Sequence, residues 1–154
     1  MDVTISTLML AVLWPLMLLI ALLVRLTSPG PVLYRRRIRG LNGRPFDVLK
    51  FRSMIDNAHD MMVADPVLRE EYARNLKIKN DPRVTLFGRF LRKSSLDELP
   101  QFLNVLAGDM SLVGPRMLGD IELAKYGVHQ AKVLSVKLGI TGLWQTSGRH
   151  RTSF

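Results

Sequence analysis

The chain begins with its longest apolar run. Residues 3–24, "VTISTLMLAVLWPLMLLIALLV", contain no charged side chain, and a helix of this length can cross the hydrocarbon core of a bilayer. A secretory signal is disfavoured because Met1 and Asp2 provide no basic segment before the run, and no small-residue cleavage site follows it. We therefore expect a membrane-associated helix at residues 1–26.

Pro15 lies in the middle of this run and leaves its topology open. Proline removes a helix hydrogen bond and clashes with the preceding turn. A kinked helix that spans the bilayer and a helix that breaks at Pro15 and re-enters the same face both fit the pattern. Physical reasoning alone favours the kinked span, because a re-entrant segment must satisfy its freed backbone groups inside the membrane.

The pattern after this helix predicts a small hairpin followed by helices. Turn residues at 27–31, "TSPGP", separate the apolar helix from the rest. The segments 32–38 and 45–54 read as two short strands around a glycine-containing connection. Alternation along the second strand would place Lys50 and Arg52 on one face. Asp65, with Pro66 at the first helical position, predicts a surface helix that ends at residue 76.

Three more helices are expected in the second half of the chain. Apolar residues at helical spacing with bases on the other side predict a basic amphipathic helix from residue 86. Such a helix suits the lipid headgroup layer, although packing its apolar face on a core explains the pattern equally well. A second apolar stripe runs along residues 96–106, and 118–128 predicts a short helix. The fold class expected is α+β, predominantly helical.

Charge and composition narrow the function classes. The formal net charge is +9, and residues 25–52 hold eight Lys or Arg against one acid, Asp47. A nucleic-acid binder would spread its bases over the folded domain, whereas bases beside an apolar helix suit an anionic membrane surface. The chain has no cysteine, so disulfides and thiolate chemistry are excluded.

Two adjacent carboxylates, Asp97 and Glu98, interrupt this basic pattern. Ser95 to Glu98 matches a capping box, in which Glu98 would reach back to the Ser95 amide. In a second frame Asp97 is the cap and Pro100 occupies the third helical position. Either frame keeps the carboxylates at a helix N-terminus, where the macrodipole favours their ionised form. Spacing alone favours capping over catalysis.

Several bases in turn-rich segments change this balance in favour of phosphate chemistry. Arginine on loops is well suited to bind phosphate through two parallel hydrogen bonds. The chain has no GxxxxGK[ST] or GxGxxG motif, and its three histidines lack metal-ligand spacing. A divalent cation would therefore depend on carboxylates and phosphate oxygens, as Mg²⁺ normally does. The candidate bases are Lys50, Arg52, Arg83, Arg92, Arg116 and Arg149.

Four segments together resemble the monotopic phosphoglycosyl transferases, the bacterial sugar transferase family that acts on undecaprenyl phosphate. They are the apolar run with Pro15, "SPGPVLYRRRIRGLNGRPFDVLKFRSM", "DPRVTLFGRFLRKSSLDELPQFLNVLAGDMSLVGPR" and "GITGLWQTSGR". The segments occur in order and cover most of the chain. The resemblance implies a re-entrant helix bent at Pro15, a small β-hairpin and amphipathic interfacial helices.

The resemblance also implies a reaction. Asp97 would attack the β-phosphate of a UDP-sugar, release UMP and form a covalent phosphosugar–aspartate, which polyprenyl phosphate then attacks. Glu98 would help to hold Mg²⁺, and the six bases would contact phosphate or substrate. Such a reaction begins the synthesis of exopolysaccharide, O-antigen of lipopolysaccharide, or other glycoconjugates.

The partners implied are a UDP-sugar donor, a polyprenyl phosphate acceptor and membrane lipids, with a homodimer as an option and no nucleic acid. The catalytic domain, residues 27–154, would lie on the cytoplasmic face of the bacterial inner membrane.

The sequence departs from the family pattern in two places that matter. Met117 stands where the second proline of "GPRP" is usual, which we expect to loosen the loop of Arg116. Family members also continue past "SGR", so we expect this chain to lack the usual C-terminal segment. The alternative function is therefore a truncated, non-catalytic homologue that binds membranes or a partner.

Overall fold

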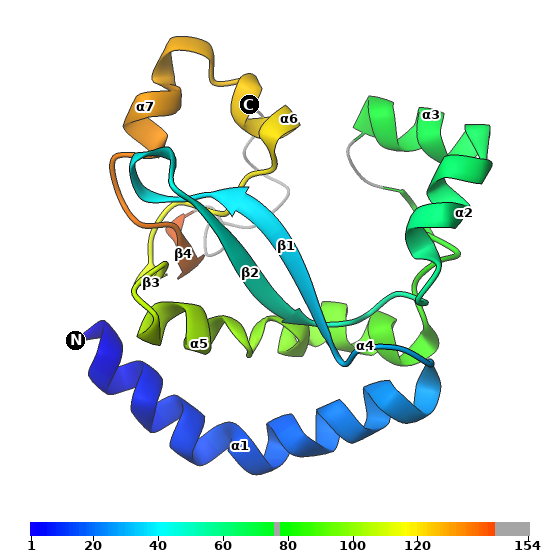
Figure 1. The fold of residues 1–154 in the computed structure, drawn as a ribbon, viewed down its shortest axis with the longest axis horizontal. Helices are drawn as coiled ribbons and strands as arrows, with labels where there is room; N and C mark the ends of the chain where they lie inside the picture. The colour runs from blue at the N-terminus through cyan, green and yellow to red at the C-terminus, as the bar shows by residue number, and fades with distance from the viewer. Residues whose placement is uncertain (76–77, 144–154) are drawn as a thin grey trace. The chain divides into compact units, whose positions relative to one another are not determined.

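The computed structural model describes residues 1–75 and 78–143. Helices predominate and a two-stranded hairpin accompanies them, so the expected α+β class is confirmed (Figure 1). The chain forms two compact units. The first comprises Met1–Pro15, Arg35–Lys50 and the described residues from Glu98 on, and the second comprises Leu16–Tyr34 and Phe51–Asp97.

The apolar N-terminal run forms helix α1, Asp2–Thr27, which continues through Pro15. Within the described residues, α1 is long and apolar enough to cross a membrane by length and composition. Most of its leucine, valine and isoleucine side chains are exposed in the protein, as expected for a helix that lipid surrounds. The predicted helix is therefore present, while its topology stays a prediction.

The first unit is built on the hairpin, which packs on a small apolar core. Strands β1 (Leu33–Arg39) and β2 (Pro45–Phe51) pair around a short 3-10 turn, η1 (Leu41–Gly43). Asn42 and Gly43 both have positive φ in this turn, which asparagine and glycine tolerate best. The predicted hairpin is confirmed. Its core cluster consists of Ile38, Phe46, Val48, Val105, Met110, Met117 and Leu138.

Helix α5 (Gln101–Leu106) is followed in the same unit by a second pair of strands, which are parallel to each other. These are β3 (Ser111–Val113) and β4 (Gly139–Thr141), with Ser111 opposite Gly139 and Val113 opposite Thr141. Between them lie α6 (Asp120–Ala124), η3 (Gly127–His129) and α7 (Gln130–Val133). The short helix expected at 118–128 is therefore confirmed.

Two glycines allow the backbones of β4 and the end of β3 to meet. A Cβ on Gly114 would lie 2.4 Å from the carbonyl oxygen of Lys137, and a Cβ on Gly139 would lie 2.1 Å from the Gly114 nitrogen. The Gly114 amide donates to Thr141, and the Gly139 amide donates to Pro115, both at 2.9 Å. These bonds hold the backbone that immediately precedes Arg116.

The second unit contains α2 (Ala58–Ala64), α3 (Pro66–Asn75) and α4 (Leu86–Ser94). The predicted start of α3 is confirmed, since the Asp65 carboxylate accepts hydrogen bonds from the amides of Val67 and Leu68 at 2.8 and 3.2 Å. Helix α4 begins with Thr85, whose hydroxyl accepts from the Gly88 amide at 2.9 Å.

Helix α4 packs one side on a core, which is one of the two alternatives that its sequence left open; its place in the headgroup layer stays a prediction. Gly88 and Leu91 are buried in the second unit, so one side of the helix packs on a core. Leu86 and Phe90 are exposed, and the Phe87 and Phe90 rings stack with centroids 6.0 Å apart. An apolar strip therefore remains on the surface beside the bases of α4.

The predicted capping frames around Asp97 are wrong. Ser95 ends α4 in the left-handed conformation, with φ 59°, and residues Leu96–Glu98 form a 3-10 turn, η2. Helix α5 begins only after Pro100, which is its cap. The stripe expected over 96–106 is thus divided between η2 and α5, because the left-handed Ser95 and Pro100 both interrupt regular helix.

Gly114→Ala should destabilise the first unit. The added methyl group would force the two backbones apart, at a cost of about 1–3 kcal/mol in the free energy of unfolding. Thermal unfolding in detergent, followed by circular dichroism, measures this loss. Val113→Ala is the control, because Val113 is the adjacent residue and is exposed at the end of β3. Equal unfolding midpoints for the wild type and Gly114→Ala would contradict the close packing.

Candidate functional site

The two adjacent carboxylates have different surroundings. Asp97 is buried at 8% exposure, within the turn η2. The side chain of Glu98 is 31% exposed, and its Oε1 forms an ion pair with Nζ of Lys50 at 2.6 Å. Among the described residues, Oε2 of Glu98 has no hydrogen-bond partner. Glu98 can therefore offer an oxygen to a ligand, while Asp97 is largely shielded from bulk water.

Lys50 is held in place through strand β2, to which Asn104 of α5 is bonded. The Asn104 amide accepts from the backbone nitrogen of Leu49 at 3.0 Å and donates to the carbonyl of Asp47 at 2.8 Å. Asn104 is only 4% exposed, so these bonds form away from water and fix the strand beside α5. Lys50 and Glu98 therefore come together within the first unit, a pairing that the sequence did not predict.

A buried ion pair, Asp81 with Arg83, lies in the second unit. Nε and Nη2 of Arg83 donate to the two carboxylate oxygens of Asp81 at 2.9 and 2.7 Å, and each residue is about 9% exposed. The hydrogen bonds from Arg83 hold the pKa of Asp81 below its ordinary value of 3.8, although burial opposes this shift. The carboxylate of Asp81 therefore neutralises the charge of Arg83 and accepts two of its hydrogen bonds.

Arg92, on α4 in the same unit, has a different arrangement. Its Nε donates to the hydroxyl of Ser53 at 2.7 Å, and no hydrogen bond from its two terminal nitrogens is found among the described residues. Burial lowers the pKa of Arg92, while the negative charges of Asp97 and Asp81 oppose that effect. Arg92 is thus an exposed cation that interacts electrostatically with Asp97, and its guanidinium fork can bind an anion.

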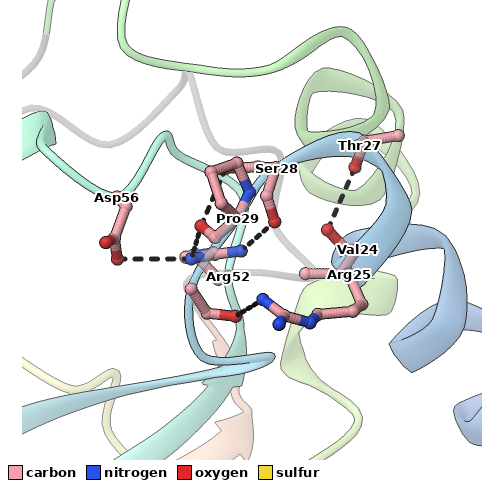
Figure 2. Close-up of polar contacts among 8 residues, drawn as sticks. Val24, Arg25, Thr27, Ser28, Pro29, Arg52 and Asp56 are labelled. Atoms are coloured by element: carbon pink, nitrogen blue, oxygen red, sulfur yellow. Dashed lines mark hydrogen bonds and ion pairs between the residues drawn. The ribbon is translucent and has the colours of Figure 1, made fainter.

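Arg52 is directed at backbone carbonyls. Its Nη1 and Nη2 donate to the carbonyls of Pro29 and Ser28 at 2.6 Å each, and Nη1 lies 3.3 Å from the Asp56 carboxylate (Figure 2). The Arg52 side chain is 7% exposed. These contacts join the turn after α1 to the segment after β2 within the second unit, and they occupy both terminal nitrogens of Arg52.

Gly30 is required where this turn passes Arg52. Its φ is +108°, and a Cβ there would lie 2.2 Å from Nη1 of Arg52. Nearby, Arg25 donates to the Gly30 carbonyl at 3.2 Å (Figure 2). The predicted role of Arg52 at phosphate stays a prediction; the contacts seen give it a place in holding the turn.

The structure describes the surroundings of Arg116 and Met117, while Arg149 lies outside the described residues. Arg116 is exposed and follows the backbone held by Gly114 and Pro115. Met117, the residue after Arg116, is buried in the core cluster. Arg83, bound to Asp81, was predicted to contact phosphate, and that role stays a prediction.

The donor groups present are compatible with a magnesium ion held partly by substrate. The described residues contain no cluster of three or more His, Cys, Asp or Glu. Mg²⁺ is usually bound by one or two carboxylates together with phosphate oxygens and water. The available oxygen of Glu98 could serve as such a carboxylate ligand. Magnesium itself stays a prediction.

Sequence reasoning missed the polar residues that position the charged ones. Asp81, Ser53 and Asn104 are all buried, and each holds a charged side chain or its strand. Asn104 had a visible signal, since it interrupts the apolar stripe of α5. Ser53 and Asp81 had no comparable signal, because they lie in short segments without a clear period.

The comparison with known proteins defines the class. The family model for bacterial sugar transferases matches residues 1–154, and this chain belongs to the bacterial sugar transferase family.

Individual relatives agree with the family assignment. The chain is 44% identical over 158 residues to an undecaprenyl-phosphate galactose phosphotransferase of Salmonella typhimurium, covering 99% of this chain and 33% of that protein. It is 43% identical over 157 residues to the exopolysaccharide production protein ExoY of Rhizobium meliloti, covering 99% and 70%. With a UDP-glucose:undecaprenyl-phosphate glucose-1-phosphate transferase of Escherichia coli it shares 43% over 150 residues, covering 96% and 30%. The chain thus spans about a third of two of these relatives.

Arg52→Lys should destabilise the protein. Lysine cannot reproduce the three contacts of the guanidinium group, and each buried carbonyl left without a donor costs about 1–3 kcal/mol. Chemical unfolding in detergent micelles measures the loss. Arg25→Lys is the control, since Arg25 is exposed and makes one such bond. A stable Arg52→Lys variant with impaired substrate binding would instead support the phosphate role.

Asp81→Asn should remove a pH-dependent part of the stability. Because the folded protein lowers the pKa of Asp81, the ion pair contributes fully above pH 3.8 and is lost as the pH falls through the lower folded pKa. We expect the variant to lose about 3 kcal/mol at pH 7 and to approach the wild type in acid. Unfolding curves from pH 7 down to pH 3 measure the difference. Asp60→Asn, exposed in the same unit, is the control, and a difference independent of pH would refute the assignment.

Proposed function

We propose that this chain transfers a sugar 1-phosphate from a UDP-sugar to polyprenyl phosphate. Membership of the bacterial sugar transferase family supports this function, as do relatives whose names specify transfer of galactose or glucose phosphate to undecaprenyl phosphate. The observation that carries the proposal is the buried carboxylate of Asp97, which interacts electrostatically with the Arg92 guanidinium group. In this proposal Asp97 is the nucleophile, and Arg92 is the neighbouring group that binds phosphate.

In the first step, a carboxylate oxygen of Asp97 attacks the β-phosphorus of the UDP-sugar. The bond from that phosphorus to the bridging oxygen breaks, and UMP leaves with the electron pair. In the second step, a phosphate oxygen of the polyprenyl phosphate attacks the same phosphorus and the bond to Asp97 breaks. The carboxylate is regenerated, and the product is a polyprenyl diphosphate sugar.

Attack of an anion on a diphosphate requires that negative charge be offset. Arg83 is already neutralised by Asp81, whereas Arg92 interacts electrostatically with Asp97. We propose that Arg92 balances the charge of Asp97 before transfer and the charge of the phosphate during it. Its free terminal nitrogens can form two parallel hydrogen bonds to phosphate oxygens. Arg116 and Arg149 are proposed as further substrate contacts on the basis of their motifs.

Glu98 and Lys50 are proposed to act beside the leaving group. The unpartnered Oε2 of Glu98 would hold Mg²⁺ together with diphosphate oxygens, and the ion would offset charge on the departing UMP. Lys50 bonds the other oxygen at 2.6 Å. That bond fixes the orientation of the Glu98 carboxylate, and the lysine adds a positive charge near the proposed ion.

A lipid acceptor lies in the membrane, so an enzyme that uses it must also be held at the membrane, which the apolar helix α1 can do. We propose that α1 holds the chain on the bacterial inner membrane with the site on the cytoplasmic side, as the positive-inside rule indicates for the bases after it. A re-entrant path bent at Pro15 is the proposed topology. The exposed Leu86 and Phe90 on α4, with the neighbouring bases, suit the headgroup layer.

A second candidate is a homologue that binds membranes without turnover. The observation in its favour is that the exposed apolar side chains of α1 and α4 suit a membrane surface without requiring the carboxylates to react. Both candidates predict membrane binding, so turnover separates them.

Asp97→Asn should abolish UMP release and the covalent adduct while leaving membrane binding unchanged. The amide is not a nucleophile at neutral pH, so we expect a loss of at least about 10³-fold. Detergent-purified protein is incubated with Mg²⁺ and UDP-galactose or UDP-glucose, with and without undecaprenyl phosphate. UMP is measured by chromatography, and the adduct by intact mass.

Asp109→Asn is the matched control, because it removes the same charge elsewhere in the chain. Retained adduct formation in Asp97→Asn would assign the nucleophile elsewhere. Folded, membrane-bound wild type that releases no UMP from a wider panel of UDP-sugars would support the non-catalytic candidate.

A further inference from the structure

Ser53 lies at a point where three backbone contacts fix its position. Its carbonyl accepts from the Thr85 amide at 3.1 Å. The next residues pair with the same segment, since Met54 forms an antiparallel bridge with Val84 and the Ile55 amide donates to Arg83 at 2.9 Å. Ser53 is therefore bound to the residues that immediately precede helix α4.

Helix α4 also approaches Ser53 more closely than a side chain would permit. A Cβ on Gly88 would lie 2.0 Å from the Ser53 carbonyl oxygen, so glycine alone allows this contact. Gly88 and Arg92 are four residues apart on α4 and thus lie on the same face. The close approach brings the Ser53 hydroxyl within 2.7 Å of Nε of Arg92.

The hydrogen bond at Nε determines how the guanidinium group can turn. A guanidinium is planar, so a bond to Nε leaves the fork of the two terminal nitrogens pointing in a fixed direction. Ser53 is 7% exposed, so water has little access to the hydroxyl that accepts this bond, although Arg92 itself lies on the exposed side of α4. Without the hydroxyl, the long side chain of Arg92 would gain rotamer freedom.

We infer that Ser53 is a positioning residue that orients the fork of Arg92 toward the phosphate that Asp97 attacks. This inference rests on the proposed function. The Ser53 hydroxyl does not contact substrate in it; Ser53 acts through Arg92. The segment of Ser53, the Gly88 contact and the Arg92 bond together form one rigid support for that fork.

The test is a double-mutant cycle with Ser53→Ala, Arg92→Lys and the double variant. Adduct formation from UDP-galactose or UDP-glucose is followed in a single turnover by intact mass. Losing a hydrogen bond to a charged group should slow adduct formation about 10- to 100-fold in Ser53→Ala. In the Arg92→Lys background, which lacks Nε, the same change should have almost no further effect.

Two readouts separate positioning from a general structural role. Ser53→Ala should lower the single-turnover rate with an unfolding midpoint close to that of the wild type. The Nε–H NMR signal of Arg92, assigned by its loss in Arg92→Lys, should shift in Ser53→Ala. Ser94→Ala is the matched control, because its hydroxyl on the same helix bonds only the carbonyls of Phe90 and Leu91.

The outcomes are distinguishable. Additive losses in the cycle, or an unchanged Arg92 signal, would overturn the role of Ser53. The proposed function would still stand in that case, provided that the wild type forms the adduct. A loss of activity that follows only a loss of fold would also overturn it. Wild type that forms neither adduct nor UMP would overturn the proposed function and, with it, the catalytic part of this inference.

Discussion

Burying the guanidinium group of Arg52 is the constraint on which the second unit depends. A buried cation without partners is strongly unfavourable, so acceptors must converge on it. The carbonyls of Ser28 and Pro29 do so only because the chain turns sharply after α1, and Gly30 has the positive φ that this turn requires. The end of the apolar helix is thereby tied to the segment that leaves β2. Loss of this contact would release the turn and Arg52 together.

The same short segment supports the candidate site. Phe51, Arg52 and Ser53 are consecutive and all buried, and their side chains make different contacts. Phe51 packs in the apolar interior, Arg52 binds the turn, and Ser53 binds the start of α4 and Arg92. Because adjacent residues share one backbone, the tie to the apolar helix and the orientation of Arg92 are set by a single stretch of chain. In the proposed reaction, precise placement of Arg92 matters because electrostatic stabilisation depends on donors that are oriented before the reaction.

The sequence predicted elements better than contacts, and the reasons are physical. The apolar run, the hairpin and the Asp65 cap follow local periods and local capping, so they could be found from neighbouring residues. The start of α5 could not, because Ser95 takes a left-handed conformation and shifts the frame past both carboxylates. Pairings such as Arg83 with Asp81, or Arg92 with Ser53, depend on which of several similar bases meets which acceptor. Arg52 and Arg92 are the same residue type in the sequence. They differ only in the groups that their side chains bind, which are backbone carbonyls for Arg52 and the Ser53 hydroxyl for Arg92.

The different burial of Asp97 and Glu98 suits the different parts that we propose for these two adjacent carboxylates in one reaction. A nucleophile benefits from a site that excludes water, since solvation weakens its attack and water would hydrolyse an acyl phosphate. A carboxylate that binds a hydrated cation instead needs an accessible oxygen, because Mg²⁺ retains several waters. Asp97, at 8% exposure, meets the first condition, and Glu98, at 31% with one oxygen on Lys50, meets the second. The 3-10 turn makes this division possible, because consecutive residues in it point in different directions. Exchanging the two residues would therefore place each acid in the environment suited to the other, even though the charge of the site would be unchanged.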